Sequence, residues 1–237
     1  MKKILYLLMA ALLLPGCSNS KLEMKVSKNY VSWKNGTIQF RTYTHAEGVN
    51  FNGPAFEVIL KKADGKKIHM PVDSYALGYG ASSPMGELGF YKPQKLAKAE
   101  ILIKTDEMMI IHLSYEPWMI FDEPITLDKQ ITIYNNSPIL KIIDYYTGNF
   151  ELLNVATGMT TASVGTVKEI KNGFSIDYPY GVTSVIVMPD SQEQSVNQGL
   201  GTVLLKKEVV NNEPRRYYIG ISDKGETYLL DELDKIL

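Results

Sequence analysis

The chain has 237 residues, and its 25 Lys and Arg residues nearly balance 26 Asp and Glu residues, which gives a net charge of −1. This balance excludes the strongly basic footprint of a nucleic-acid-binding protein. The densest basic group lies on both sides of an expected turn and consists of Lys61, Lys62, Lys66 and Lys67. Such a group is more typical of a solvated hairpin end than of a binding patch. Because Cys17 is the only cysteine, disulfides and thiolate metal sites are excluded, and the fold depends on its core.

The first residues form a pattern typical of exported lipoproteins. Lys2 and Lys3 precede an apolar run over residues 4–14, and the run closes with Leu14-Pro15-Gly16-Cys17. The run is too short for a membrane-spanning helix, which needs about 20 residues. We therefore expect a signal peptide over 1–16, acylation of Cys17 and a polar tether over 17–29. The expected partner there is a lipid bilayer, and the expected location is the cell envelope, as an outer-membrane lipoprotein.

From residue 30 onward, apolar and polar residues alternate with the period of half-buried strands. Ile38 and Phe40, for example, alternate with Gln39 and Arg41. One run is long enough that we expect a bend or bulge near Lys129. The expected strands cover 38–43, 56–61, 97–104, 111–115, 125–133, 139–146, 152–158, 163–170, 174–178, 183–188, 201–208 and 217–222.

Turn signals such as Asn35-Gly36 and Asp64-Gly65 separate these runs, and no helical crossover lies between them. This pattern predicts an all-β protein, a large antiparallel β-sandwich, as one domain over 30–237. The end of the chain differs, because Leu229, Leu233 and Ile236 fall at helical spacing. We expect one short helix over 227–237.

The segment from Tyr75 to Tyr91 combines clustered glycines with aromatic rings and one carboxylate, Glu87. Glycine permits close backbone approach to a ligand, and tyrosine rings such as those of Tyr75 and Tyr79 offer flat faces with a polar tip. Sugar rings suit this combination. The alternative is an irregular crossing at a sheet edge, where glycines satisfy the backbone geometry and tyrosines fill the core.

A second candidate group lies on the polar faces of two early strands. If these strands pair, Arg41, Tyr43, Glu57 and Lys61 share one surface of a sheet, where they could bind a ligand. An exposed surface of salt bridges is the alternative.

Two isolated residues complete the candidates. His112 lies on the polar side of its expected strand and could act as an acid or base, although a structural role is the alternative. Trp118 could stack on a sugar ring or pack in a corner of the fold. The three histidines are widely separated, and no P-loop or Gly-x-Gly-x-x-Gly motif occurs, so we expect no metal and no cofactor.

Several blocks occur in an order that resembles the domain of unknown function 4861 family, over roughly residues 30–205. The blocks are Trp33 to Tyr43, Gly53 to Val58, Tyr79 to Gly89, Ile125 to Leu127, Tyr146 to Gly148 and Ala156 to Gly158. The resemblance implies a galactose-mutarotase-like supersandwich, in lipoproteins of polysaccharide-degrading Gram-negative bacteria. Members carry a His-containing segment where this chain has Tyr75 to Tyr79, so no catalytic residue is carried over.

Two main functions follow, and both take carbohydrate as the ligand. The first is a carbohydrate-active enzyme, such as a lyase, an epimerase or a glycosidase accessory. It would use Glu87 or Glu57 as acid or base, Tyr79 as partner, and Arg41 to hold a uronate carboxylate. The second is a glycan-binding lipoprotein without catalysis, and a purely structural envelope role is a third. The sequence leaves the glycan, the membrane face and the oligomeric state open.

Overall fold

The computed structural model describes residues 21–36, 38–45, 54–62, 64–70, 77–86, 89–120, 122–161, 164–197 and 201–237. Within these ranges the strands pair antiparallel in three sheets, and the described helix is the short α1 near the C-terminus. The all-β class, the antiparallel sandwich and the C-terminal helix are therefore confirmed. No helix in the described part of the chain is long and apolar enough to cross a bilayer.

The strands divide into one large sheet and two smaller ones. The first small sheet contains, in order, β1 (Leu22–Val26), β2 (Tyr30–Asn35), β3 (Ile38–Tyr43), β4 (Glu57–Lys61) and β5 (Lys67–Met70). The second contains β17 (Glu193–Asn197), β18 (Thr202–Val209), β13 (Leu153–Thr160), β6 (Ala81–Gly86) and β7 (Gly89–Phe90). The large sheet runs through β14 (Thr166–Ile170), β15 (Gly173–Tyr178), β16 (Val182–Val187), β19 (Pro214–Ser222), β12 (Ile139–Gly148), β11 (Glu123–Tyr134), β9 (Met108–Tyr115) and β8 (Leu96–Lys104), with β10 (Trp118–Ile120) paired to β11.

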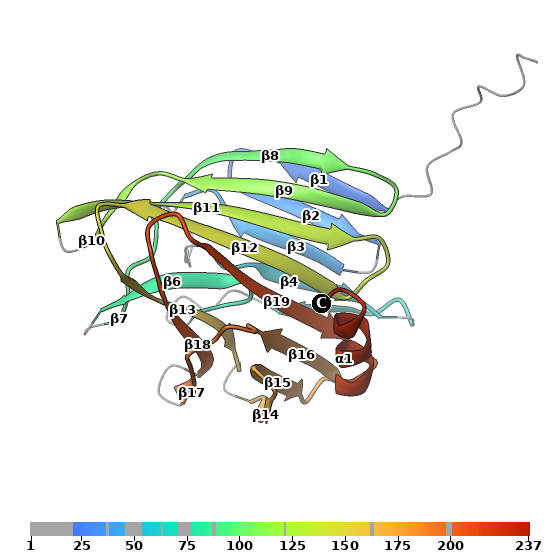
Figure 1. Ribbon diagram of the computed structural model, residues 1–237. Helices are drawn as coiled ribbons and strands as arrows, with labels where there is room; N and C mark the ends of the chain where they lie inside the picture. Colours follow the sequence, from blue (N-terminus) through green and yellow to red (C-terminus); the bar gives the residue numbers. More distant parts are fainter. Residues whose placement is uncertain are drawn as a thin grey trace, which may run out of the picture.

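The main core lies between the large sheet and the two small ones (Figure 1). The first small sheet contributes an aromatic group in which the Trp33 and Phe56 rings meet edge to face at 4.9 Å. Burying such large apolar side chains is the main source of stability in a domain without disulfides. On the opposite face of the large sheet, α1 (Glu226–Asp234) buries Leu229 and Leu233 in a separate apolar cluster with Ile139 and Tyr218.

Most hairpin turns fall where the sequence placed them. Positive φ angles occur at Gly36 and Gly65, and also at Asn136, Asn172 and Asn212. These residue types accept the left-handed region that tight hairpins require. Most strands from β9 to β19 also lie within about three residues of their expected bounds, but β10 and β17 were not expected.

The tether prediction is wrong for residues 22–26, because these residues form β1. The strand pairs antiparallel with β2, and Leu22 is fully buried in the core. Alternation is weak in this segment, since only Leu22 of the five residues is buried. The domain therefore starts before Tyr30.

The strand expected over 97–104 is present, but it lacks the expected half-buried alternation. This segment lies in β8, the edge strand of the large sheet, and its register with β9 shifts at two places. Ile101, Leu102 and Ile103 are each exposed by more than 40%. Bulges of this kind are frequent at sheet edges.

The expected bulge near Lys129 is absent, because β11 pairs in unbroken register with both β9 and β12. Lys129 occupies the same inward phase as Leu127 and Ile131, and its side chain is fully buried. The alternation therefore continues through the lysine. A charged residue in the core needs partners, which are described below.

Candidate functional site

The predicted polar face on the early strands is present. β3 and β4 pair so that Arg41 lies directly opposite Glu57. The distance from Arg41 Nη1 to Glu57 Oε2 is 3.1 Å. β5 adds a residue that the sequence reasoning had not connected with them, because His69 Nε2 lies 2.6 Å from Glu57 Oε1. We call Arg41, Glu57 and His69 the Arg–Glu–His cluster.

The three side chains of this cluster differ in exposure. The Glu57 side chain is 7% exposed, whereas that of Arg41 is 28% exposed and that of His69 is 55% exposed. Because a carboxylate beside a guanidinium accepts a hydrogen bond, neutral His69 holds its proton on Nε2. Its Nδ1 lone pair then has no partner among the described residues, on a side chain that is 55% exposed. This is the arrangement of a base oriented by a buried carboxylate.

The cluster also has unused hydrogen-bonding capacity. Arg41 Nε and Glu57 Oε2 are buried, and neither has an aligned hydrogen-bond partner among the described residues. The contact between Arg41 and Glu57 is therefore an ion pair without full hydrogen-bond geometry. Buried polar atoms without partners are rare in folded proteins, and each needs an explanation, such as a bound water or ion or a catalytic role.

Two tyrosines flank the cluster on the same face. Tyr30 and Tyr43 lie opposite each other on β2 and β3, and the Arg41 guanidinium sits 4.6 Å from the centre of the Tyr30 ring. This cation–π contact holds the guanidinium in place, and the Arg41 side chain as a whole is 28% exposed. Lys61, on the same strand as Glu57, faces Lys67 on β5.

The glycine–tyrosine segment is only partly described, since Tyr75 and Glu87 lie outside the described residues, as does Cys17. Tyr79 is buried, and its hydroxyl donates to the Tyr178 hydroxyl at 2.6 Å. Burial raises the pKa of Tyr79 well above its ordinary value, so this phenol stays protonated. In this structure Tyr79 fills the core, which favours the alternative of a sheet-edge crossing for this residue.

Gly80 shows why the crossing needs glycine. Its φ is +66°, and a Cβ added there would lie 2.1 Å from a ring carbon of Phe56. The Gly80 carbonyl points into the core, where Lys129 Nζ and the Tyr217 hydroxyl donate to it. The glycine therefore lets the backbone itself act as a polar core group.

Trp118 and His112 are both engaged by neighbours. The Trp118 indole donates to the Tyr91 carbonyl at 3.0 Å, and the side chain is buried. His112 lies on the outer face of the large sheet, where Nδ1 is 3.2 Å from Glu100 and Nε2 is 2.9 Å from Asp128. With both ring nitrogens occupied, His112 has no free position for a base, in contrast to His69.

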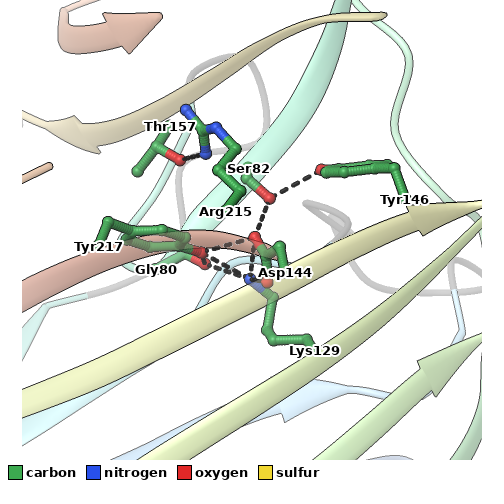
Figure 2. Close-up of polar contacts among 8 residues, drawn as sticks. All are labelled: Gly80, Ser82, Lys129, Asp144, Tyr146, Thr157, Arg215 and Tyr217. Atoms are coloured by element: carbon green, nitrogen blue, oxygen red, sulfur yellow. Dashed lines mark hydrogen bonds and ion pairs between the residues drawn. The ribbon is translucent and has the colours of Figure 1, made fainter. Parts of the chain in front are cut away.

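A fully buried charged network joins the large sheet to the second small sheet (Figure 2). Lys129, Asp144 and Arg215 lie opposite one another on β11, β12 and β19. Lys129 Nζ is 2.7 Å and 2.9 Å from the two Asp144 oxygens and 2.6 Å from the Tyr217 hydroxyl. Burial lowers the pKa of Lys129, and the Asp144 carboxylate opposes that shift.

The second small sheet supplies the other partners of this network. Ser82 on β6 donates to Asp144 and lies 2.7 Å from the Tyr146 hydroxyl. Arg215 donates to Thr157 on β13 and to the Leu205 carbonyl at 3.0 Å. Lys129, Asp144 and Arg215 have no exposed surface, so a ligand from solvent cannot reach them. We therefore assign this network to the stability of the fold and not to binding.

The comparisons with known proteins identify the family. The model described as domain of unknown function (DUF4861) matches residues 74–229. The chain belongs to the DUF4861 family. The match begins and ends later than the range of 30–205 on which the resemblance rested, and it leaves out the blocks at Trp33 and Gly53. No curated protein matches the chain.

Solved structures share the fold of this DUF4861 protein at low identity. An active YidC insertase has a TM-score of 0.58 at 14% identity, covering 98% of this chain and 48% of that one. YidC from Thermotoga maritima has a TM-score of 0.53 at 10% identity, covering 90% and 54%. A heparan sulfate lyase HepC mutant from Pedobacter heparinus has a TM-score of 0.51 at 10% identity, covering 86% and 35%. The chain spans about half of the two YidC chains and about a third of the lyase, and at these identities the likeness concerns the fold alone.

Proposed function

We propose that this DUF4861 protein is a membrane-anchored lipoprotein that handles carbohydrate and binds acidic glycans at the Arg–Glu–His cluster. One observation carries the proposal: an accessible guanidinium and an exposed imidazole meet on one buried carboxylate whose hydrogen-bonding capacity is not used up. The fold does not select this function, since it occurs both in insertases and in a heparan sulfate lyase. We therefore base the proposal on the chemistry of the Arg–Glu–His cluster.

The residues of the cluster match the parts of a uronate. A sugar carboxylate would pair with N–H groups of the Arg41 guanidinium that Glu57, which lies 3.1 Å from Nη1, leaves without a partner. The rings of Tyr30 and Tyr43 give flat faces beside the guanidinium, and sugar rings pack well on such faces. Neutral sugars would keep the aromatic contact but lose the charge pair.

A second candidate, catalysis, is favoured by the free Nδ1 of His69. In an elimination reaction, Nδ1 would take the proton from the carbon next to the uronate carboxyl. The electron pair of that C–H bond would form a carbon–carbon double bond, and the glycosidic C–O bond would break, with the leaving oxygen protonated by water. Glu57 would act as a positioning residue that stabilises the imidazolium. Glycan binding without turnover is the alternative.

Arg41→Ala tests the site. We expect it to weaken binding of an oligouronate by about 1.5–3 kcal/mol, the scale of a charge-assisted hydrogen bond, with a smaller effect on neutral oligosaccharides. The measurement is titration calorimetry with both glycans. Arg216→Ala is the matched control, because Arg216 is an exposed arginine on β19. Equal oligouronate affinity in wild type and Arg41→Ala, or no heat with any glycan, would refute the site.

Cys17→Ala tests the anchor. We expect the substitution to abolish incorporation of labelled fatty acid and to release the protein from membranes, because several acyl chains together give stable anchoring. Folding should be unchanged, since Cys17 is the only cysteine and has no disulfide partner. Fractionation after a carbonate wash provides the measurement, and a variant that stays with the membrane would contradict the lipoprotein proposal.

A further inference from the structure

A pocket of about 540 Å³ lies at one end of the sandwich, beside α1. Its walls come from widely separated segments, including the residue before β1, the ends of β4 and β19, and the turns after β2 and β11. Four of the residues that line it are lysines: Lys21, Lys61, Lys62 and Lys224. The pocket has the size of a small-molecule site, and we call it the lysine pocket.

The lysine pocket has a surplus of positive charge. Asp223 is its one acidic lining residue, and no lysine of the pocket forms an ion pair within the described ranges. Lys224 instead lies over the Tyr228 ring, 4.4 Å from its centre. Lys61 also faces Lys67 across β4 and β5, and like charges in that position destabilise a sheet. Uncompensated lysines around a hollow are suited to an anionic ligand.

The position of the lysine pocket points to the source of that anion. Leu22 is fully buried in β1, so Lys21 is fixed at the edge of the folded domain. Cys17 lies four residues earlier, and four extended residues reach at most about 14 Å. If Cys17 is acylated, the lysine pocket is held within that distance of the bilayer surface. Lysines so close to an anionic membrane are attracted to it.

We propose that the lysine pocket binds the phosphate headgroup of an anionic phospholipid in the membrane that holds Cys17. The proposal rests on the lipid anchor proposed above and adds a second contact between the domain and the bilayer. Acyl chains alone would not fix the orientation of the domain on the membrane. Headgroup binding beside α1 would fix which end of the sandwich faces the membrane.

Vesicle binding of the chain from residue 17 with Cys17→Ser, which has no acyl group, tests the proposal. It should float with vesicles of equal parts phosphatidylcholine and phosphatidylglycerol, and not with phosphatidylcholine alone. Because each lysine near such a surface contributes about 1 kcal/mol, losing two should weaken partitioning about thirtyfold. The variant is Lys62→Glu with Lys224→Glu, whose charge reversal should weaken partitioning by at least this factor. The control, Lys95→Glu with Lys98→Glu, makes the same charge change near the start of β8 and should bind almost as wild type.

Several results would overturn the proposal. The first is equal binding of the Cys17→Ser chain to both vesicle types. The second is an equal loss of vesicle binding in the control and in the lysine-pocket variant. The third is tighter binding of the chain to inorganic phosphate, measured by calorimetry, than to the anionic vesicles. The last result would assign the lysine pocket to a soluble anion. If the glutamate pair perturbs folding, Lys62→Gln with Lys224→Gln gives the same test without charge reversal. Because the probe carries no acyl chain, its result is independent of acylation and of glycan binding at Arg41.

Discussion

Asp144→Asn is expected to reduce the free energy of unfolding by about 3–5 kcal/mol, the usual cost of removing one partner from a buried ion pair. Asp144 has no exposed surface and is the carboxylate that balances Lys129 and Arg215 in the core network. Asparagine keeps one acceptor oxygen but not the negative charge, so the buried cations Lys129 and Arg215 lose their counter-ion. The donors Lys129, Ser82 and Tyr217 must then share a single oxygen. Urea unfolding followed by circular dichroism measures the change.

Asp128→Asn is the matched control for this stability prediction. Asp128 is on the next strand, but its side chain is 43% exposed on the outer face. Its loss should cost less than about 1 kcal/mol, as is usual for exposed pairs.

A double-mutant cycle with Lys129→Met should give a large favourable coupling energy between Lys129 and Asp144. If Asp144→Asn unfolds at the same urea concentration as Asp128→Asn, the network does not stabilise the fold.

His69→Gln is expected to reduce turnover of a uronate polymer about 10²- to 10⁴-fold, the usual contribution of a general base. Glutamine can still donate a hydrogen bond to Glu57, but it cannot take a proton. Oligouronate affinity should change much less than turnover, which separates catalysis from binding. The measurement is the ultraviolet absorbance of the unsaturated uronate product.

His112→Gln is the control for His69→Gln. Both nitrogens of His112 are engaged by carboxylates, so its replacement should leave turnover unchanged. Equal turnover by His69→Gln and wild type would exclude His69 as the base. Absence of turnover in the wild type would leave the non-catalytic binder as the function of the cluster.

Much of the fold follows from local patterns in the sequence. Strands such as β9 and β11 alternate strictly between core and solvent, and alternation alone locates them. Lys129 shows the limit of this reasoning. A lysine in an inward position suggests a bulge until its partners are known. Asp144 lies on the next strand, but Gly80 and Tyr217 come from distant parts of the chain. The apolar residues of β8 are exposed because β8 is an edge strand, and alternation does not reveal which strands lie at an edge.

The candidate site was predictable only in part. Arg41 and Glu57 lie on strands that follow one another in the chain, so their pairing could be expected from the order of the strands. The separation of the histidines along the chain does not reveal His69, because its partner Glu57 lies on the adjacent strand. The alternation of Lys67-Ile68-His69-Met70 carried the signal. The lysine pocket could not be predicted, since its lysines come from three separate segments.

Imidazole NMR of the histidines during titration with an oligouronate tests the central claim most directly. The chain has three histidines, so the His69 and His112 signals can be assigned from the His69→Gln and His112→Gln variants. The proposed site predicts that the His69 signal shifts in a saturable manner while that of His112 stays in place, and that Arg41→Ala weakens the His69 response. Unchanged His69 signals at saturating oligouronate, or equal shifts at His69 and His112, would contradict acidic glycan binding at the Arg–Glu–His cluster.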